Sequence, residues 1–363
     1  MNESRVVGQV RIVGAGLLGA SIGLRLRAAG VDVIVDDSSP SNLNLAIDYG
    51  AGRAARDTDD PALIVVAVPP DVTAAVVATE LTAYPDALVT DVASVKVAPL
   101  AELRAAGADT LRYIGSHPLA GRERGGAISA RADLFIGRPW VVTPHDDIPT
   151  AQISIIEDLV LDLGAVPVIM SAEQHDSSVA LVSHVPQVVS TLLAKQLLRS
   201  TEAAISLAGQ GLRDTTRIAS SDPELWVQIL GANSADVVPI LRDFRDDLDG
   251  LLTALAAPAV PGARRAVAEV LADGNAGVAR IPGKHGQDRR FSQIVVMVDD
   301  RAGELARLLT EIGGIGVNME DLRLEHSPGA QVGLAEISVL PEVEDRLIAD
   351  LEAGGWKIAG AWR

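Results

Sequence analysis

The chain has 363 residues, 48% hydrophobic and 22% charged, which predicts two or three domains with ample apolar core. Its formal charge of −17 argues against nucleic acid or an anionic membrane as a partner. With no cysteine, disulfides and thiolate zinc sites are excluded, and a reducing compartment is consistent. We find no apolar run of about 18 uncharged residues and no signal-peptide core, so we expect a cytoplasmic protein without a membrane span.

A glycine-rich turn near the start of the chain joins a predicted strand to a predicted helix. The apolar run 10–13 is followed by GAGLLG at 14–19, a helical pattern, and a second β-branched run at 31–35. This order is typical of a dinucleotide-binding βαβ unit, although a glycine turn in another α/β protein is the alternative. Gly14 permits the sharp turn, Gly16 lets the backbone approach a pyrophosphate, and Gly19 lets the helix pack close to the strand. The N–H groups and dipole at the helix start favour the phosphate charge.

The acidic residue at the end of the second predicted strand indicates which dinucleotide binds. Asp36, 22 positions after Gly14, can accept hydrogen bonds from a ribose 2′-hydroxyl. A 2′-phosphate would instead meet Asp36 and Asp37, with no basic residue before Arg53. The sequence therefore favours NAD over NADP.

Later apolar runs continue the alternation of strands and helices. Strands are predicted at 63–68, 87–90, 113–114 and 139–143, so residues 1–170 are expected to form a doubly wound Rossmann domain. Ligands bind beyond the carboxyl ends of such strands, and therefore the segments that hold Ser94 and His117 should face the cofactor. The residues expected to bind the cofactor are Gly14, Gly16, Leu18, Gly19, Asp36, Val68, Pro69 and Ser94.

Residues 171–257 read as an all-α domain. One helix is predicted at 173–198, with a kink at Pro186, and another begins at Asp222-Pro223. The helix that starts at Ser234 has a wide apolar stripe, which fits a shared dimer core or a self-contained bundle. Residues 258–290 read as a linker around one short helix.

Residues 291–363 show a different pattern. Strands are predicted at 292–298, 321–325, 332–339 and 357–361, with helices at 303–312 and 342–353 and a turn at 327–330. This βαββαβ order predicts a ferredoxin-like, four-stranded antiparallel sheet with both helices on one face.

Few residues are suited to acid–base chemistry, because the chain has six histidines. His117 is predicted in a loop just past a strand, where it is a candidate general base or a residue that caps backbone. His184 lies beside Pro186, and His175-Asp176 fits ordinary first-turn chemistry of a helix. Arg217, like its neighbour Arg213, could grip a carboxylate through two hydrogen bonds or be solvated. No metal site is expected, since HExxH and cysteine are absent and the remaining histidines are isolated.

Taken together, the motifs resemble the prephenate/arogenate dehydrogenase family of tyrosine biosynthesis. The ordered set is GAGLLG at 14–19, DVASVK at 91–96, SHPLAGRERGG at 116–126, HD at 175–176, SHVP at 183–186 and GLRDTTRIASSDPELW at 211–226. The C-terminal segment resembles an ACT domain, a small amino-acid-sensing module. Together the two resemblances cover nearly the whole chain.

The resemblance implies NAD-dependent oxidative decarboxylation of prephenate to 4-hydroxyphenylpyruvate. His117 would accept the proton of the C4 hydroxyl, Ser94 would orient that hydroxyl, and Arg217 would bind a substrate carboxylate. His184 and Gln187 would line the substrate pocket, and Trp226 would pack near a dimer interface. The helical domain would form a homodimer, and the C-terminal domain would bind tyrosine as an effector.

Two departures from the family pattern leave alternatives open. Gln187 stands where many prephenate-specific relatives carry a second histidine, so arogenate is the alternative substrate. Ala302 replaces the usual proline of the ACT loop, whose φ would otherwise be restricted.

A β-hydroxyacid dehydrogenase is a weaker alternative, because its lysine base is missing from the expected position after Asn233. A non-catalytic sensor of NAD and amino acids is the other class.

Overall fold

The computed structural model describes residues 4–121, 125–281, 291–326 and 332–362. The chain divides into two compact units, one of residues 1–198 and 216–244, the other of residues 199–215 and 245–363. The turn predicted at 327–330 and the end of the linker at 282–290 lie outside the described residues.

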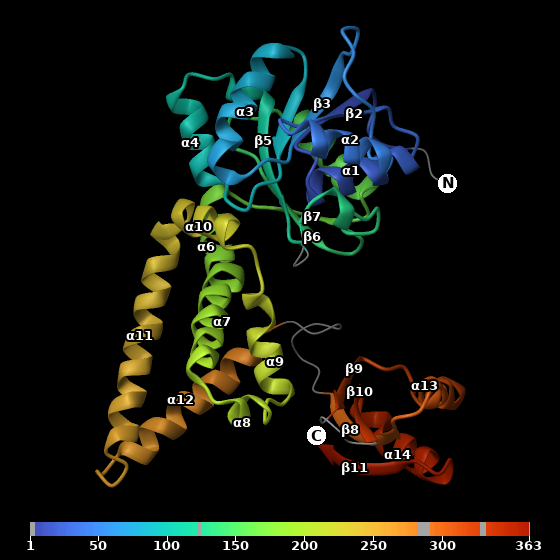
Figure 1. Cartoon of the computed structure of the whole chain (residues 1–363), viewed down its shortest axis with the longest axis vertical. Coiled ribbons are helices and arrows are strands. Elements are labelled where there is room, and N and C mark those ends of the chain that lie inside the picture. Colours follow the sequence, from blue (N-terminus) through green and yellow to red (C-terminus); the bar gives the residue numbers. More distant parts are fainter. Residues whose placement is uncertain (1–3, 122–124, 282–290, 327–331, 363) are drawn as a thin grey trace. The chain divides into compact units, whose positions relative to one another are not determined.

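A seven-stranded sheet forms the centre of the first unit (Figure 1). The first five strands in the chain pair in parallel, β6 runs antiparallel to β5, and β7 is parallel to β6. In order across the sheet the strands are β2 (Val33–Asp36), β1 (Gln9–Val13), β3 (Pro61–Val66), β4 (Leu88–Asp91), β5 (Tyr113–Pro118), β6 (Pro139–Thr143) and β7 (Val166–Ile169).

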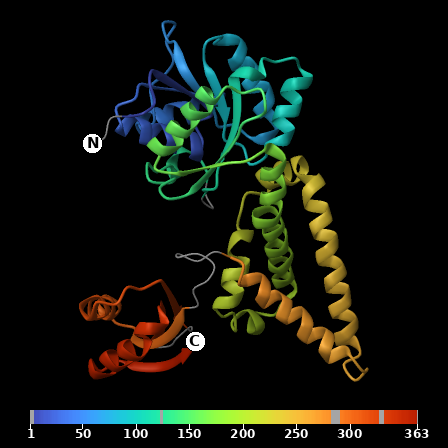
Figure 2. The ribbon, with the colours of Figure 1, turned by 180° about the vertical axis from the view of Figure 1, so that it is seen from behind.

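Helices cover both faces of this sheet (Figures 1 and 2). On β3, Leu63 and Val65 belong to one apolar core, and Ile64 and Val66 to the other. The first core includes residues of α1 (Leu17–Ala28), α2 (Pro40–Asp48) and α5 (Thr150–Asp162), and the second includes residues of α3 (Pro70–Ala83) and α4 (Val97–Ala105). Because side chains alternate along a strand, a strand buried on both faces must be continuously apolar. The predicted doubly wound Rossmann arrangement is confirmed.

A long helical rod follows the sheet (Figure 1). It consists of α6 (Ala172–Val179), the π-helical turn η3 (Ala180–His184) and α7 (Val185–Gln196). The kink predicted at Pro186 takes the form of this π turn, because proline has no N–H and clashes with the carbonyl four residues earlier. Among the described residues, only the stretch Ala172–Arg199 has the length and apolar composition of a membrane span. Three polar residues of this stretch, His175, Asp176 and His184, are buried.

Further helices follow the rod, namely α8 (Glu202–Ile205), α9 (Gln210–Thr216), α10 (Pro223–Ala232), α11 (Ser234–Ala256) and α12 (Ala263–Val278). Asp222 caps α10 as predicted, its carboxylate accepting a hydrogen bond from the N–H of Glu224 at 2.9 Å. The short helix expected within the linker is in fact α12, with 16 residues. It continues through Gly274 and Gly277, since a glycine costs a helix only about 1 kcal/mol relative to alanine.

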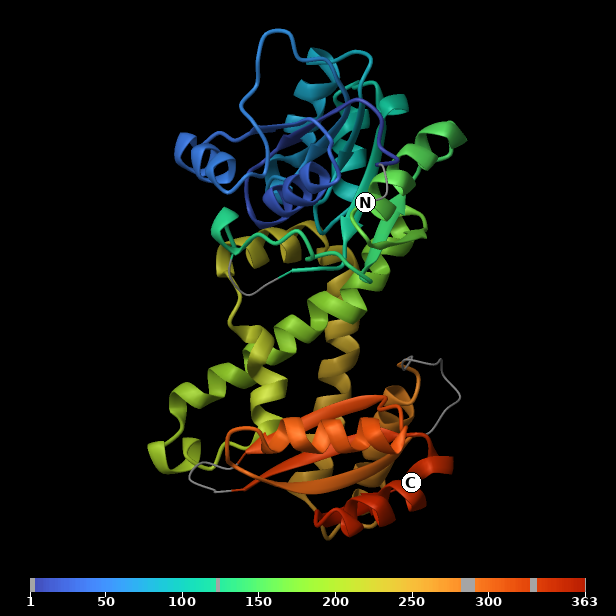
Figure 3. The same cartoon turned by 90° about the vertical axis from the view of Figure 1, so that its right-hand side faces the viewer.

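The second unit contains a four-stranded antiparallel sheet (Figure 3). Its order is β11 (Lys357–Trp362), β8 (Ser292–Asp299), β10 (Val332–Val339) and β9 (Asp321–His326). One apolar core holds alternate residues of β8 and β10 together with Leu308 and Ile312 of α13 (Glu304–Ile315) and Leu347 and Leu351 of α14 (Glu344–Ala353). Both helices therefore pack on one face, and the predicted βαββαβ arrangement is confirmed.

Candidate active site

The turn between β1 and α1 has the geometry of a diphosphate cradle. Gly14 has φ +105°, and a Cβ there would lie 2.3 Å from the carbonyl oxygen of Ala67, just after β3. A Cβ on Gly19 would lie 1.9 Å from the carbonyl oxygen of Gly14. By contrast, a Cβ on Gly16 would meet nothing within 4 Å, and no side chain caps the N-terminus of α1. Two glycines are thus required for packing, and the third faces the open space that an anion at a helix N-terminus would occupy.

The other residues expected to contact the cofactor lie at the same edge of the sheet. Leu18 is in the first turn of α1, Val68 and Pro69 connect β3 to α3, and Ser94 lies in the bend after β4. In this strand order β1 lies between β2 and β3, where the chain reverses direction across the sheet. The carboxyl ends at such a point form the usual binding crevice of open α/β sheets.

Asp36, the last residue of β2, forms an ion pair that the sequence did not reveal. Its Oδ2 lies 2.6 Å from an Arg11 guanidinium nitrogen on β1. The expectation that no basic residue lies near this carboxylate before Arg53 is therefore wrong. Arg11 precedes Asp36 in the chain, and it reaches the carboxylate because Val13 pairs with Asp36 and Arg11 lies two residues earlier on the same face. Arg53 instead pairs with Asp32 and Asp59.

His117 lies within a strand, contrary to the loop predicted for it. β5 extends to Pro118, and His117 is paired with Val141 of β6. The antiparallel partner β6 extends the strand beyond the short apolar run 113–114, and such a tertiary pairing leaves no local signal. The half-buried imidazole is thus attached to a rigid element rather than to a mobile loop.

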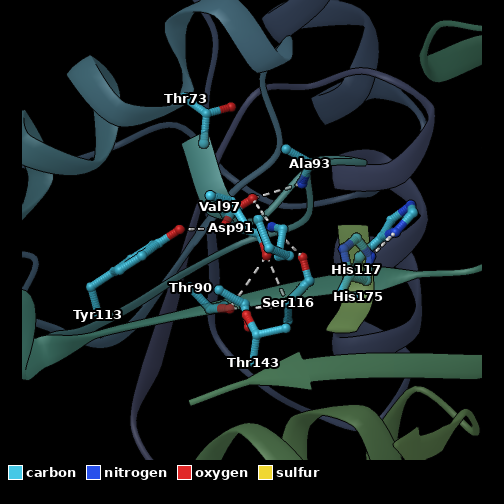
Figure 4. Close-up of polar contacts among 12 residues, drawn as sticks. Thr73, Thr90, Asp91, Ala93, Val97, Tyr113, Ser116, His117, Thr143 and His175 are labelled. Atoms are coloured by element: carbon cyan, nitrogen blue, oxygen red, sulfur yellow. Dashed lines mark hydrogen bonds and ion pairs between the residues drawn. The ribbon is translucent and has the colours of Figure 1, made fainter. Parts of the chain in front are cut away.

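A chain of hydrogen bonds connects His117 to Asp176 through His175. Figure 4 shows the contact between His117 and His175. Nδ1 of His117 lies 2.9 Å from Nε2 of His175, and Nδ1 of His175 lies 2.7 Å from Oδ1 of Asp176. An ionised carboxylate can only accept, so His175 donates from Nδ1 and its Nε2 accepts from Nδ1–H of His117. This assignment leaves the lone pair of His117 on Nε2, where a base would need it.

Asp176 is itself fixed by the first turn of α4. Its two carboxylate oxygens accept the N–H groups of Lys96 at 2.8 Å and Val97 at 2.9 Å. A carboxylate at a helix N-terminus is favoured by the unpaired N–H groups and by the dipole. The side chain of Lys96 is buried, forms an ion pair with Asp91 and donates to the carbonyl of Ser116 at 2.7 Å. This network joins the ends of β4 and β5 to α6.

The surroundings of His117 favour its neutral form. Burial lowers the pKa of His117 well below its usual value, and positive charge on His175, Lys96 and His184 would lower it further. Burial also lowers the pKa of Lys96, against the opposing effect of Asp91. A neutral imidazole with an available Nε2 is the form that general base catalysis requires.

His184, at the end of the π turn η3, forms a second buried polar group. The side-chain amide of Asn233 donates to the carbonyl of Asp176 at 2.8 Å and lies 3.0 Å from Nδ1 of His184. Since the amide nitrogen is the donor, Nδ1 of His184 accepts and its Nε2 carries the hydrogen. Burial lowers the pKa of His184 to about 4. The ring of Trp226 lies edge-on to His184 with the ring centroids 6.0 Å apart, within the same chain.

The remaining predicted substrate residues lie on helices of the same unit. Gln187 is buried in the first turn of α7. Arg217 is exposed at the start of the short turn η5 (Arg217–Ala219), which packs against α7. The sequence singles out Gln187 and Arg217 as candidates but gives no signal for the contacts of five other residues, namely His175, Asp176, Asn233, Lys96 and Arg11. The adjacent pair His175-Asp176 is visible in the sequence. Its contact with His117 depends on α6 lying against β5, and no local pattern predicts that packing.

Comparisons with known proteins give a consistent result. Residues 22–169 match the model of the prephenate dehydrogenase nucleotide-binding domain, and residues 171–269 match the model of the prephenate dehydrogenase dimerization domain. A probable prephenate dehydrogenase, NovF of Streptomyces niveus, is 37% identical over 355 residues, covering 95% of this chain and 98% of the relative.

Two solved structures share the fold. Prephenate dehydrogenase from A. aeolicus, in complex with hydroxyphenyl propionate and NAD+, matches with a TM-score of 0.66 and 26% identity, over 76% of this chain and 99% of that chain. Synechocystis arogenate dehydrogenase matches with a TM-score of 0.59 and 28% identity, over 74% of this chain and 99% of that chain. This chain belongs to the prephenate dehydrogenase family.

Proposed function

We propose that the protein is an NAD-dependent prephenate dehydrogenase, which converts prephenate to 4-hydroxyphenylpyruvate and CO₂. The relay from Asp176 through His175 to His117 carries this proposal, because it holds a neutral imidazole with an available Nε2 at the cofactor edge of the Rossmann sheet. Membership of the family adds the substrate class.

His117 takes the proton of the C4 hydroxyl on Nε2 while a hydride leaves C4. The chemistry that bound NAD+ would supply is acceptance of this hydride, with the cofactor held by the glycine turn and Asp36. Loss of CO₂ from the ring then returns an electron pair to the C4 oxygen, and His117 gives the proton back to that oxygen as the ring becomes aromatic. Ser94 orients the hydroxyl, and the Asp176 carboxylate stabilises the charge that develops along the two imidazoles.

The cofactor is held by the residues that the fold collects at the ends of β1, β2, β3 and β4. Gly14, Gly16 and Gly19 form the turn under the diphosphate, and the carboxylate of Asp36 accepts hydrogen bonds from the ribose hydroxyls. Leu18, Val68, Pro69 and Ser94 complete this contact surface. The open space at Gly16 supports the proposal, since that is where a diphosphate must approach the backbone.

The substrate is held by residues of the helical segment. Arg217 binds a carboxylate through its planar guanidinium, and His184 contributes a donor from Nε2. Gln187, buried on α7, lines the pocket and bears on the choice between the pyruvyl side chain of prephenate and the alanyl side chain of arogenate. Arogenate is the alternative substrate, because this position carries Gln187 rather than a second histidine.

The test is to measure kcat/KM with NAD+ and either prephenate or arogenate, following NADH and identifying the ring product. We expect one NADH and one CO₂ for each prephenate consumed, with a lower kcat/KM for arogenate. A higher kcat/KM for arogenate would reassign the substrate, and turnover of neither would refute the reaction.

We further propose that the protein acts as a cytoplasmic homodimer, with α11 in the interface. The match of residues 171–269 to a dimerization domain supports this assembly.

The C-terminal βαββαβ sheet has the strand order of an ACT module, and on that basis we propose that it binds an amino-acid effector, tyrosine in the first instance. The test is binding of tyrosine to the full chain by calorimetry, with inhibition assays alongside.

A further inference from the structure

The ribose end of the proposed cofactor site contains an unusual buried cation. Arg11 is in the middle of β1, the second strand from one edge of the sheet, and its side chain is only 9% exposed. A guanidinium stays charged in any protein environment, so its burial requires acidic partners. Although burial opposes it, the hydrogen bonds and charges of Glu80 and Asp36 raise the pKa of Arg11 above its usual value.

The guanidinium is held by contacts with three side chains. Its Nε lies 2.8 Å from one oxygen of Glu80 on α3, and one terminal nitrogen lies 3.2 Å from the other. The same terminal nitrogen lies 2.6 Å from Oδ2 of Asp36. The ring of Tyr84 lies 5.5 Å from the guanidinium carbon. Arg11 is therefore fixed in place, with one nitrogen shared between the two acids.

Asp36 lies between this cation and solvent. Its side chain is 43% exposed, whereas those of Arg11 and Glu80 are both below 10%. One carboxylate oxygen is occupied by Arg11, which restricts the orientation of the other. With Asp36 in place, the Arg11, Glu80 and Asp36 cluster has a net charge of −1 and repels a phosphate. Without Asp36, the remaining pair of Arg11 and Glu80 has no net charge, and the terminal nitrogen that contacts Asp36 loses that partner.

We propose that Arg11 is a specificity-determining residue for the cofactor. Paired with Asp36, it directs the carboxylate to the ribose hydroxyls of NAD, and freed from Asp36 it is a binding group for a 2′-phosphate. The inference rests on the proposed use of NAD. It adds that the chain already contains a cation that could recognise NADP, and that the carboxylate of Asp36 lies between this cation and solvent. Asp37 does not pair with Arg11 in place of Asp36, because its carboxylate accepts hydrogen bonds from the N–H groups of Ala15 at 2.7 Å and Ser39 at 2.8 Å.

The test measures binding of ADP-ribose and 2′-phospho-ADP-ribose by isothermal titration calorimetry, with no turnover required. In the Asp36→Ser variant, affinity for 2′-phospho-ADP-ribose should rise about 10- to 100-fold, the range for hydrogen bonds to a charged group. Affinity for ADP-ribose should fall about 10-fold. The matched control is Asp32→Ser, which removes one exposed acid just before β2, where it pairs with Arg53 and not with Arg11. It should change neither affinity by more than about twofold, since distant exposed charges are screened by salt.

A second set of variants tests whether Arg11 is the residue that binds the 2′-phosphate. Arg11→Met alone would leave Glu80 buried without its cation, so Glu80→Gln accompanies it, and thermal unfolding confirms that the protein is folded. Adding Asp36→Ser to the Arg11→Met/Glu80→Gln variant should give no gain in affinity for 2′-phospho-ADP-ribose. The proposal is overturned if this triple variant keeps the gain, or if Asp36→Ser binds the phosphorylated ligand no better than Asp32→Ser.

These measurements also separate the inference from the proposed function. If the wild-type protein does not bind ADP-ribose, both fail. If the protein binds ADP-ribose but turns over neither prephenate nor arogenate, the proposed reaction is refuted. The affinities of the Asp36 and Arg11 variants for 2′-phospho-ADP-ribose then still test the proposed role of Arg11.

Discussion

Nε2 of His117 is the atom on which the proposed reaction depends, since Nδ1 is engaged with His175. An asparagine can keep a hydrogen bond to His175 but cannot accept and return a proton. We expect His117→Asn to lower kcat by about 10²- to 10⁴-fold, the usual contribution of a general base. Steady-state kinetics at saturating NAD+ and prephenate measures this loss. A kcat within about threefold of wild type would remove His117 from the role.

The low pKa of His117 has a consequence for the pH profile. A base works when deprotonated, and a pKa well below 6.5 extends its deprotonated range to lower pH. We expect kcat/KM for prephenate to be level from about pH 6 to 8 and to fall only at more acidic pH. An acidic limb with its midpoint near 6.5, the ordinary value for histidine, would contradict the burial argument.

Arg217 and Arg213 lie four residues apart in one motif and form a matched pair for mutation. If Arg217 holds a substrate carboxylate in ground and transition states alike, Arg217→Gln should raise KM about 10- to 100-fold with little change in kcat. Arg213→Gln, which removes a neighbouring exposed arginine, should leave KM within about twofold. An effect on KM from Arg213→Gln alone would move the carboxylate site to that residue.

At the scale of elements, the rod formed by α6, η3 and α7 carries several buried polar groups. His175 and Asp176 lie on α6, whereas His184 ends the π turn that precedes Pro186. A π turn inserts an extra residue into the helical ladder and so re-aims the side chains that follow it. In this chain it accompanies the placement of His184 against Asn233 and Trp226.

The buried neutral His184 should make the stability of the protein depend on pH. Its pKa is about 4 in the folded state and about 6.5 when unfolded, so between these values the unfolded chain binds more protons. The free energy of unfolding should therefore rise as pH increases from 4 to 6.5, by up to about 3 kcal/mol from this residue.

Urea denaturation across that pH range, compared with His184→Gln, isolates the contribution. Glutamine can still accept a hydrogen bond from Asn233 but does not titrate, so its stability curve should be flatter by that amount. Parallel curves for the two proteins would show that His184 is not buried as a neutral group.

At the scale of the whole molecule, several apolar side chains of α11 remain exposed in a single chain. Leu248, Leu252 and Leu255 are 43%, 54% and 56% exposed. Exposed apolar side chains that recur along one helix mark an interaction surface, and the match to a dimerization domain points to a second copy.

We expect Leu248→Asp combined with Leu252→Asp to convert a dimer to a monomer, because burying two carboxylates at an apolar interface is strongly unfavourable. Sedimentation equilibrium measures the change. Leu111→Asp is the control, since Leu111 is 51% exposed on the nucleotide-binding domain, outside the proposed interface. Unchanged dimers in the α11 double variant would exclude this helix from the interface.

Local patterns in the sequence predicted the chain order of the elements in the C-terminal sheet and six of the seven strands of the larger sheet, but not β7 (Val166–Ile169). They also predicted the glycine turn and the helix start at Asp222-Pro223, and they singled out His117 as the candidate base. These follow from signals between near neighbours, such as apolar periodicity, glycine spacing and capping residues. Only the tertiary structure decided that β5 extends through His117, that His175 and Asp176 orient it, and that Arg11 lies under Asp36. Those contacts join different strands and helices, as in the 58-residue separation of His117 from His175, and no pattern along the chain encodes which distant residues will meet.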